Sequence, residues 1–263
     1  MADDTLVHVN HLWHSYNAGG VNDTDVLQDI ELEIRHKEII AVVGPSGCGK
    51  TTLLNLLSGT GRPSKGSLRV SGREPVAGSP DIGVMFARDA LLPWRTAVRN
   101  VELGMEIRNI PSGQRRERAR QALADVGLAL FHGKYPAELS QGMRQRVALA
   151  RTFALEPKLL LMDEPFAALD AQTKILVQDK FVQLKERRDI TVLLITHDLA
   201  EAIALADRVV LMTRGPGRVR TIHQVNLPRP RSILSLQGDP EFHAIYEKLW
   251  NELREEVNVE NSP

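Results

Sequence analysis

Alternating hydrophobic and polar positions mark the first part of the chain. In residues 5–16 and 26–34 apolar side chains recur at every second position, most clearly Leu32 and Ile34 between charged neighbours. Such alternation is typical of a strand with one face in the core and the other in water, which favours antiparallel pairing. We therefore expect an antiparallel β subdomain at the N-terminus.

Three uninterrupted apolar runs predict a second, buried sheet. They cover residues 39–43, 159–162 and 190–195, and helical patterning separates the last two. Short continuous runs of this kind occur in strands that are covered on both faces, and strands that alternate with helices form parallel sheets. The predicted fold class is therefore α/β, with a mostly parallel core sheet.

A charge-rich, helix-favouring stretch of about residues 96–157 interrupts this pattern. Within it, residues 115–127 form an amphipathic candidate, and we interpret the whole stretch as a helical subdomain inserted into the α/β core. A turn after Met212 followed by alternation in 219–225 suggests a hairpin. We expect one domain over 1–225 and a C-terminal extension over 226–263, with an amphipathic helix at 240–257.

Composition and charge narrow the class of protein. With 263 residues, of which 43% are hydrophobic, the chain can bury a large core without disulfides, and its single cysteine excludes an intramolecular disulfide. The 33 basic and 33 acidic residues balance, so the overall charge carries no signature of a nucleic-acid binder, which leaves local basic patches as an open alternative. The acidic, polar opening does not resemble a signal peptide. No apolar run approaches the roughly 20 residues of a membrane-spanning helix, so a membrane role would require a partner.

Residues 44–51 match the phosphate-loop pattern G-x-x-x-x-G-K-[ST] at every fixed position, after a predicted strand and before a predicted helix at 51–58. Lys50 would reach the β- and γ-phosphates, and the hydroxyl of Thr51 would bind Mg²⁺. The alternative is a plain glycine-rich connection. The predicted nucleotide-binding residues here are Gly44, Pro45, Ser46, Gly47, Cys48, Gly49, Lys50, Thr51 and Thr52. Kinases, GTPases, helicases and transport ATPases all share such a loop.

A second motif selects among these classes. Residues 139–146 read Leu-Ser-Gln-Gly-Met-Arg-Gln-Arg and precede the acidic pair that ends 159–164. Here the sequence, over about residues 5–225, resembles the ATP-binding-cassette (ABC) family, whose signature is usually written LSGGQ. Gln141 and Met143 differ from that consensus, whereas Ser140 and Gly142 agree with it. Physically, Ser140 can cap a helix that starts there and form a second anion-binding helix end.

The resemblance implies a head-to-tail dimer, in which the signature of one subunit covers the ATP bound by the phosphate loop of the other. ATP and Mg²⁺ are the implied cofactors, and the chain is expected to be an ATPase. The implied roles are catalysis for Lys50, Glu164 and His197, Mg²⁺ binding for Thr51 and Asp163, γ-phosphate contact for Ser140, Gln141 and Gly142, communication for Asp170 and adenine stacking for Tyr16, with Trp13 a weaker candidate.

Ala87 departs from the family pattern. Family members normally have a glutamine at this position, after the strand that follows the phosphate-loop helix, and it reaches Mg²⁺ and the attacking water. Alanine has no atom that can do so. We therefore expect weaker Mg²⁺ positioning, or compensation by Arg88 or Asp89, with hydrolysis slower or more dependent on the transporter partner.

The segment 91–96, Leu-Leu-Pro-Trp-Arg-Thr, suggests the branch of the family. It is either subdomain core or a docking surface for a transmembrane subunit. Together with 166–170 and 246–257 it resembles importers of nitrate, sulfonate, taurine and bicarbonate. That implies a small anionic or organic-acid cargo, permease subunits, an extracytoplasmic solute-binding protein, and a peripheral location on the cytoplasmic side of the inner membrane. The alternatives are an exporter or lipoprotein-release subunit, a soluble ABC protein, and a nucleotide-binding switch with little turnover.

Overall fold

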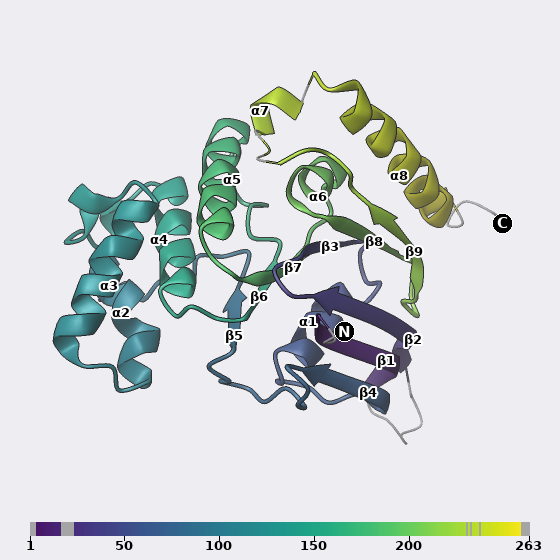
Figure 1. Ribbon diagram of the computed structural model, residues 1–263, viewed down its shortest axis with the longest axis horizontal. Helices are drawn as coiled ribbons and strands as arrows, with labels where there is room; N and C mark the ends of the chain where they lie inside the picture. Colours follow the sequence, from purple (N-terminus) through teal and green to yellow (C-terminus); the bar gives the residue numbers. More distant parts are fainter. Residues whose placement is uncertain (1–3, 17–23, 230, 232, 237, 259–263) are drawn as a thin grey trace. The chain divides into compact units, whose positions relative to one another are not determined.

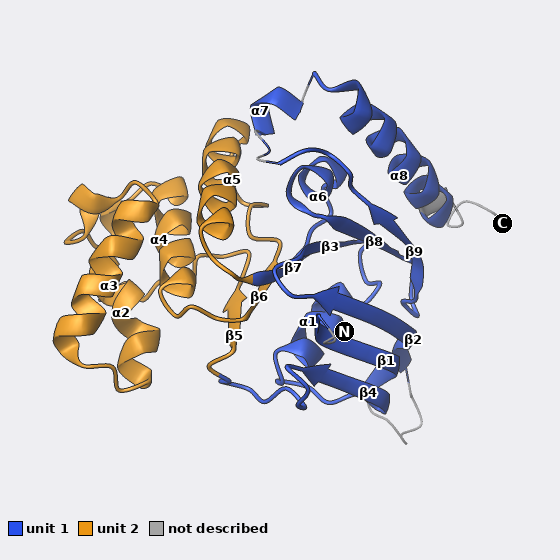
Figure 2. Ribbon diagram, viewed as in Figure 1, with its two compact units in different colours: residues 1–79, 191–263 blue, residues 80–190 orange. Residues whose placement is uncertain are grey.

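A computed structural model of the chain describes residues 4–16, 24–229, 231, 233–236 and 238–258, with side chains to 256. It divides into two compact units, one formed by residues 1–79 with 191–263 and the other by residues 80–190 (Figure 2). The expected domain boundaries at 225 and at about 96–157 stay predictions.

The first unit contains a three-stranded antiparallel sheet, as expected (Figure 1). Strand β1 (Thr5–Tyr16) lies between β2 (Thr24–Arg35) and β4 (Lys65–Val70), and Val7 faces Ile34 on one side and Val70 on the other. Strand β4 was not predicted, because only two of its six residues are buried apolar side chains. Its extended conformation follows from pairing with β1.

The core strands of the first unit are parallel, as the buried runs predicted. Strand β3 (Ile39–Val43) pairs with β7 (Thr191–Ile195) and β8 (Arg208–Met212), and β9 (Val219–Gln224) closes the predicted hairpin antiparallel to β8. Every residue of β3 and β7 is buried. Val42 faces Ile195 and Val43 faces Leu211, so these parallel strands end at one edge of the sheet. Helices α1 (Lys50–Leu57) and α6 (Leu199–Leu205) follow β3 and β7, and α1 begins one residue earlier than predicted.

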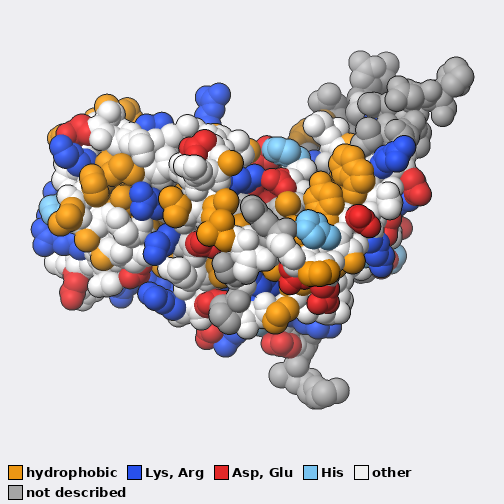
Figure 3. Space-filling model, turned by 90° about the horizontal axis from the view of Figure 1, so that it is seen from above, with side chains coloured by type: hydrophobic (Ala, Val, Ile, Leu, Met, Phe, Trp, Pro, Cys, Tyr) orange, Lys and Arg blue, Asp and Glu red, His pale blue; other side chains and the backbone are white. Residues whose placement is uncertain are grey.

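The C-terminal part of this unit comprises α7 (Ile233–Leu236) and α8 (Pro240–Asn258), the second of which was predicted at 240–257. Phe242 and Leu249 of α8 are buried. Figure 3, which shows the side of the molecule with α7 and α8, has hydrophobic side chains exposed among charged ones; Leu234 and Trp250 are the large ones on these two helices.

A buried arginine anchors the C-terminal part to the sheet. The guanidinium of Arg231 donates to the carbonyls of Ile203 and Ala206 at the end of α6, and to those of Val225 and Leu227. Burial lowers the pKa of Arg231 to about 10, which still leaves it charged at neutral pH. Its charge lies at the negative end of α6, where a cation is stabilising.

The second unit pairs two parallel strands with helices. Strand β5 (Ile82–Met85) lies beside β6 (Leu159–Asp163). The helices are α2 (Ala97–Ile107), α3 (Ser112–Asp125), α4 (Gln141–Phe153) and α5 (Ala171–Glu186), with 3₁₀ turns at Ala129–Phe131 and Pro136–Glu138. Among the residues described in either unit, no helix has the length and apolar character needed to cross a membrane.

Helix α3 corrects the prediction of an amphipathic helix at 115–127. It begins three residues earlier, directly after Pro111, and ends at Asp125. Proline is compatible with a helix start, and the φ of 74° at Gly127 places that residue in the left-handed region that ends helices.

Candidate functional site

The phosphate-loop pattern forms the connection between β3 and α1 in the first unit. A Cβ atom on Gly44 would lie 2.9 Å from Cys48 Sγ and 3.0 Å from the Met212 carbonyl, so no larger residue fits there without displacement. Gly49 has a φ of 92°, a left-handed conformation that favours glycine. The loop geometry therefore explains why these positions are glycine.

Lys50 spans this loop with its side chain. Its ammonium donates to the carbonyl oxygens of Gly44, at 2.7 Å, and Pro45, at 2.9 Å, and the residue is only 9% exposed. Because it is also the first residue of α1, a positive charge and the positive end of a helix meet at the same loop. The arrangement favours an anion.

Cys48 is buried inside the loop, with its Sγ atom 3.6 Å from Lys50 Nζ. Burial raises the pKa of the thiol despite the nearby ammonium. A neutral, covered thiol is a poor nucleophile, so the side chain has a packing role here.

The two aromatic candidates for adenine stacking lie on β1. Tyr16 is 51% exposed, and its hydroxyl lies 3.3 Å from Thr52 Oγ1 on α1. Trp13 is half-buried, with Lys65 Nζ 5.6 Å from its ring centroid. Tyr16 is thus the one of the two that reaches the phosphate-loop helix; adenine stacking by either stays a prediction.

His197 follows β7 at the sheet edge from which the phosphate loop also emerges. The N–H of Thr196 donates to the Val42 carbonyl at 3.3 Å, and the His197 side chain is exposed. The side chain of Asp198 caps α6 by accepting from the Glu201 N–H at 3.1 Å. Loops at the carboxyl ends of parallel strands form the ligand sites of α/β proteins.

In the second unit, the acidic pair lies where β6 ends. Asp163 is the last residue of the strand, and Glu164 has a φ of 48°, uncommon for a residue other than glycine. As expected, the backbone turns here, so the two neighbouring carboxylates need not point to opposite faces. Both side chains are half-buried.

The signature segment begins α4. Ser140 caps this helix by accepting a hydrogen bond from the Met143 N–H at 3.3 Å, as predicted. A Cβ atom on Gly142 would lie 2.2 Å from Thr173 Cγ2 of α5, so α4 and α5 meet at this glycine. The segment therefore has a capped helix start whose close packing requires a glycine.

Two glutamines join the signature segment to the connection between β6 and α5. Gln141 donates to the Ala168 carbonyl, and Gln145 to the Pro165 carbonyl. Asp170 caps α5, and the hydrogen bond from Thr173 lowers its pKa. These bonds tie the signature to the segment that runs from the acidic pair to Asp170, all within this unit. Gln145 was not predicted to contribute, although its place in the signature was a signal.

The loop after β5 contains Ala87. Asp89, one of the two residues proposed to compensate for it, accepts hydrogen bonds from Arg144 Nε of α4, at 2.9 Å, and from the Leu91 N–H, at 3.2 Å. Arg151 of α4 donates to the Asp89 carbonyl. The Asp89 carboxylate is therefore engaged with the signature helix, while Arg88 is exposed.

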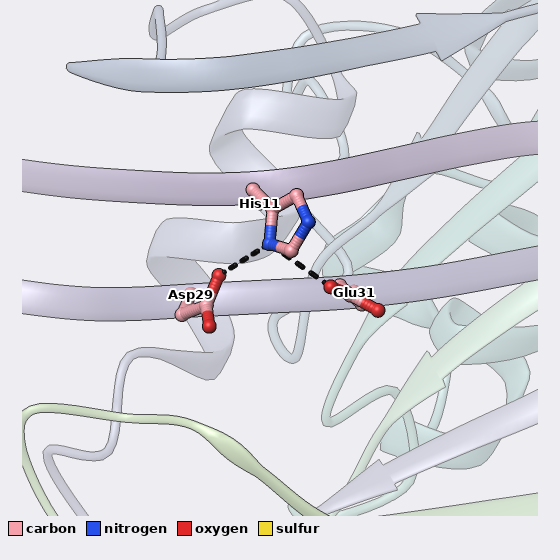
Figure 4. A group of neighbouring side chains, drawn as sticks. All are labelled: His11, Asp29 and Glu31. Carbon is pink, nitrogen blue, oxygen red and sulfur yellow. Dashed lines mark hydrogen bonds and ion pairs between the residues drawn. The ribbon is translucent and has the colours of Figure 1, made fainter.

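A separate polar cluster lies on the antiparallel sheet (Figure 4). His11 Nδ1 is 2.7 Å from a carboxylate oxygen of Asp29 and 2.9 Å from one of Glu31. The hydrogen bond to Asp29 and the charge of Glu31 raise the pKa of His11. All three side chains are exposed, and the ion pairs account for their proximity.

A buried parallel strand that leads into a glycine-rich loop and a helix defines the class of phosphate-loop nucleotide-binding proteins. A sequence profile described as "ABC transporter" matches residues 27–167. The chain is 43% identical to an uncharacterized ABC transporter ATP-binding protein of Methanocaldococcus jannaschii, over 90% of the chain and 87% of the relative.

Two relatives have names that state what they transport. The bicarbonate transport ATP-binding protein CmpC of Synechococcus elongatus is 38% identical over 97% of the chain, and the nitrate import ATP-binding protein NrtC of the same organism is 39% identical over 94%. The chain spans only 39% and 38% of their lengths. A dimeric post-hydrolysis structure of the ATP-binding cassette MJ0796, bound to ADP and Pi, superposes with a TM-score of 0.73 at 28% identity, covering 84% of this chain and all of that one.

The chain belongs to the ABC transporter family of ATP-binding proteins. It is an ATPase of that family, with the α/β fold predicted from its sequence.

Proposed function

We propose that this chain is the ATP-hydrolysing subunit of a bacterial ABC importer. Two copies, or a pseudo-symmetric pair, would form a head-to-tail sandwich around two ATP molecules. The observation that supports this most is the presence of two separate helix starts suited to phosphate, α1 behind the phosphate loop and α4 capped by Ser140. The dimeric cassette among the similar structures agrees with it.

Within this proposal the phosphate loop holds the ATP phosphates and Lys50 neutralises the β- and γ-phosphate charge. Ser140, Gln141 and Gly142 contact the γ-phosphate bound by the other copy, and Tyr16 stacks on adenine.

We propose Mg²⁺ as the metal, because the two candidate ligands offer hard oxygen atoms. Thr51 offers a hydroxyl oxygen and Asp163 a carboxylate, the hard oxygen ligands that Mg²⁺ prefers. The metal would supply charge neutralisation on the phosphate oxygens. Glu164 orients and deprotonates the attacking water, His197 contacts the γ-phosphate, and Asp170 links the two sites of the dimer.

The cargo proposed is a small anion or organic acid of the nitrate, sulfonate, taurine or bicarbonate kind. The relatives named for bicarbonate and nitrate support it. A separate permease would carry the cargo across the membrane, a solute-binding protein would deliver it, and this subunit would sit peripherally on the cytoplasmic side of the inner membrane. An exporter would share the same ATPase chemistry; the relatives favour import.

The segment 91–96 is proposed to dock the permease. Trp94 is 71% exposed, which disfavours the alternative that it belongs to the subdomain core. Buried Asn100 fixes the backbone beneath it by donating to the carbonyls of Leu92, Arg95 and Thr96. A rigid loop with an exposed tryptophan is a suitable interface anchor.

Replacing Trp94 with alanine is expected to weaken permease binding at least about tenfold, because an exposed aromatic anchor loses its contact area. The measurement is recovery of this subunit with the multi-span membrane protein encoded beside it, after co-expression and detergent extraction. Leu130→Ala, at a residue that is 91% exposed outside the segment, is the matched control. Equal recovery of both variants would refute docking through Trp94. A separate observation, a neighbouring gene for a solute-binding protein, would distinguish import from export.

Restoring glutamine at Ala87 is expected to lower the Mg²⁺ concentration needed for half-maximal ATP hydrolysis by about threefold, since one polar contact to the metal site is regained. The measurement is ATPase rate against Mg²⁺ concentration. Asp89→Asn tests the compensating role of that carboxylate in the same assay. An Ala87→Gln variant with an unchanged Mg²⁺ dependence would remove the hypothesis.

A further inference from the structure

The turn between β8 and β9 lies directly against the phosphate loop. A Cβ atom on Gly217 would lie only 1.9 Å from the Cys48 carbonyl oxygen, far inside van der Waals contact. The Gly217 N–H donates to the Val26 carbonyl at 2.8 Å, and its own carbonyl accepts from the Gln28 N–H at 2.9 Å. The backbone of Gly217 is thus fixed between β2 and the phosphate loop.

Strand β2 touches the loop at the next residue. A Cβ atom on Gly49 would lie 2.6 Å from Leu27 Cδ2 and 3.1 Å from the Val26 carbonyl oxygen. Two backbone segments, bonded to each other, therefore cover Cys48 and Gly49. Phosphate binding by such a loop depends on the direction of its backbone N–H groups, so whatever fixes this backbone also sets the affinity for phosphate.

Hydrogen bonds within the turn hold Gly217 in place. The Thr213 hydroxyl oxygen accepts from the Arg218 N–H at 3.0 Å, and the Thr213 N–H donates to the Arg218 carbonyl at 3.0 Å. The side chain of Arg218 also donates to Gln28 of β2. The turn is closed by its own residues and tied to the strand that touches the loop.

Helix α8 braces the same hairpin through carboxylates. Glu256 accepts from the Arg214 N–H in the turn, at 3.3 Å, and from the guanidinium of Arg220 on β9. One helical turn nearer the start of α8, Glu252 accepts a hydrogen bond from the Thr221 hydroxyl at 2.7 Å. The C-terminal helix is therefore connected to the phosphate loop through one hairpin.

We propose that Gly217 is a positioning residue for the phosphate loop, and that Glu256 of α8 braces the turn that presents it. The assigned role is to fix the backbone at Cys48, and not to bind the nucleotide directly. The proposal rests on the proposed function in taking residues 44–51 as the ATP phosphate site. It gives the C-terminal helix a part in setting nucleotide affinity.

The test is steady-state ATP hydrolysis and ADP binding by the full chain. Gly217→Ala is expected to raise the KM for ATP and the Kd for ADP at least about tenfold, because the loop backbone must move away from the new Cβ. Thr213→Val removes the hydroxyl that closes the turn and is expected to raise both about threefold. Glu256→Gln is expected to raise both about twofold.

Gly215→Ala is the matched control in the same turn, because its Cβ would lie 3.5 Å from the Gly47 carbonyl oxygen, an ordinary contact. It should leave KM and Kd unchanged. Loss of folded protein alone would lower the apparent kcat with KM unchanged, and thermal unfolding of each variant measures that loss separately.

A folded Gly217→Ala variant with the parent KM and Kd would overturn the proposal. If that variant does not fold, Thr213→Val decides, and unchanged KM and Kd there overturn it equally. Unchanged values in Glu256→Gln overturn the part assigned to α8. Lys50→Ala separates a failure of the phosphate-site assignment from a failure of the inference on Gly217. If Lys50→Ala leaves nucleotide binding intact, the phosphate-site assignment itself fails. If Lys50→Ala impairs binding while Gly217→Ala and Thr213→Val keep the parent KM and Kd, only the inference on Gly217 is refuted.

Discussion

Replacing Glu164 with glutamine is expected to reduce ATP turnover at least about a hundredfold while ATP binding is retained. Glutamine keeps the size of the side chain and one acceptor oxygen, but its amide cannot take up the proton of the attacking water, and general-base catalysis contributes factors of about 10² to 10⁴. The residue stands where β6 ends, with a φ of 48° that glutamine must also adopt. Phosphate release and ATP binding, measured on the same preparation, check this.

Glu156→Gln is the control for the Glu164 experiment. Glu156 also has a positive φ, of 49°, and lies after α4 in the same unit, so the two substitutions face similar backbone strain. It should turn over ATP normally. Turnover that survives in Glu164→Gln would contradict the role of Glu164 as the base. Negligible turnover in the parent chain would instead support the alternative of a nucleotide-binding switch, which Ala87 suggests.

Replacing Lys50 with alanine is expected to weaken ATP binding at least about tenfold, since a charged donor to the phosphates is lost. The folded protein should also lose about 1–3 kcal/mol of stability, because the Gly44 and Pro45 carbonyls lose the ammonium that they share. Nucleotide titration and thermal unfolding measure the two effects separately.

Lys158→Ala is the matched control for Lys50→Ala. Its ammonium makes an exposed ion pair with Asp81 at 3.2 Å, and exposed pairs contribute little to stability. Neither ATP binding nor the unfolding temperature should change appreciably. Parent-like ATP binding by Lys50→Ala would refute the phosphate-site assignment.

Strand and cap positions were predictable because local sequence decides them. The apolar run at 39–43 predicted both ends of β3 correctly, since a strand covered on both faces needs apolar side chains throughout. Ser140 was identified as a helix cap because its short side chain bonds a nearby N–H. The boundaries of α3 were less accurate, because its arginine-rich sequence buries only Ala119, Ala122 and Leu123 and gives a weak periodic signal.

Strand β4 and the neighbours of the phosphate loop were not predictable. The six residues of β4 include four exposed ones, and pairing with β1 makes them a strand. That Gly217 touches Cys48, or that Asp89 bonds to Arg144, follows from contacts between segments far apart in the chain. No periodicity or motif encodes such contacts.

The sequence by itself determined the chemistry: a phosphate loop, an acidic pair, a capped signature helix, and an alanine where the family has glutamine. Only the tertiary structure decided what holds these parts in place. The loop backbone at Cys48 and Gly49 is packed between a turn and a strand, and the Asp89 carboxylate is bonded to the signature helix. Motifs are local because a phosphate is bound by consecutive backbone groups, whereas the rigidity of that backbone depends on close packing between remote segments.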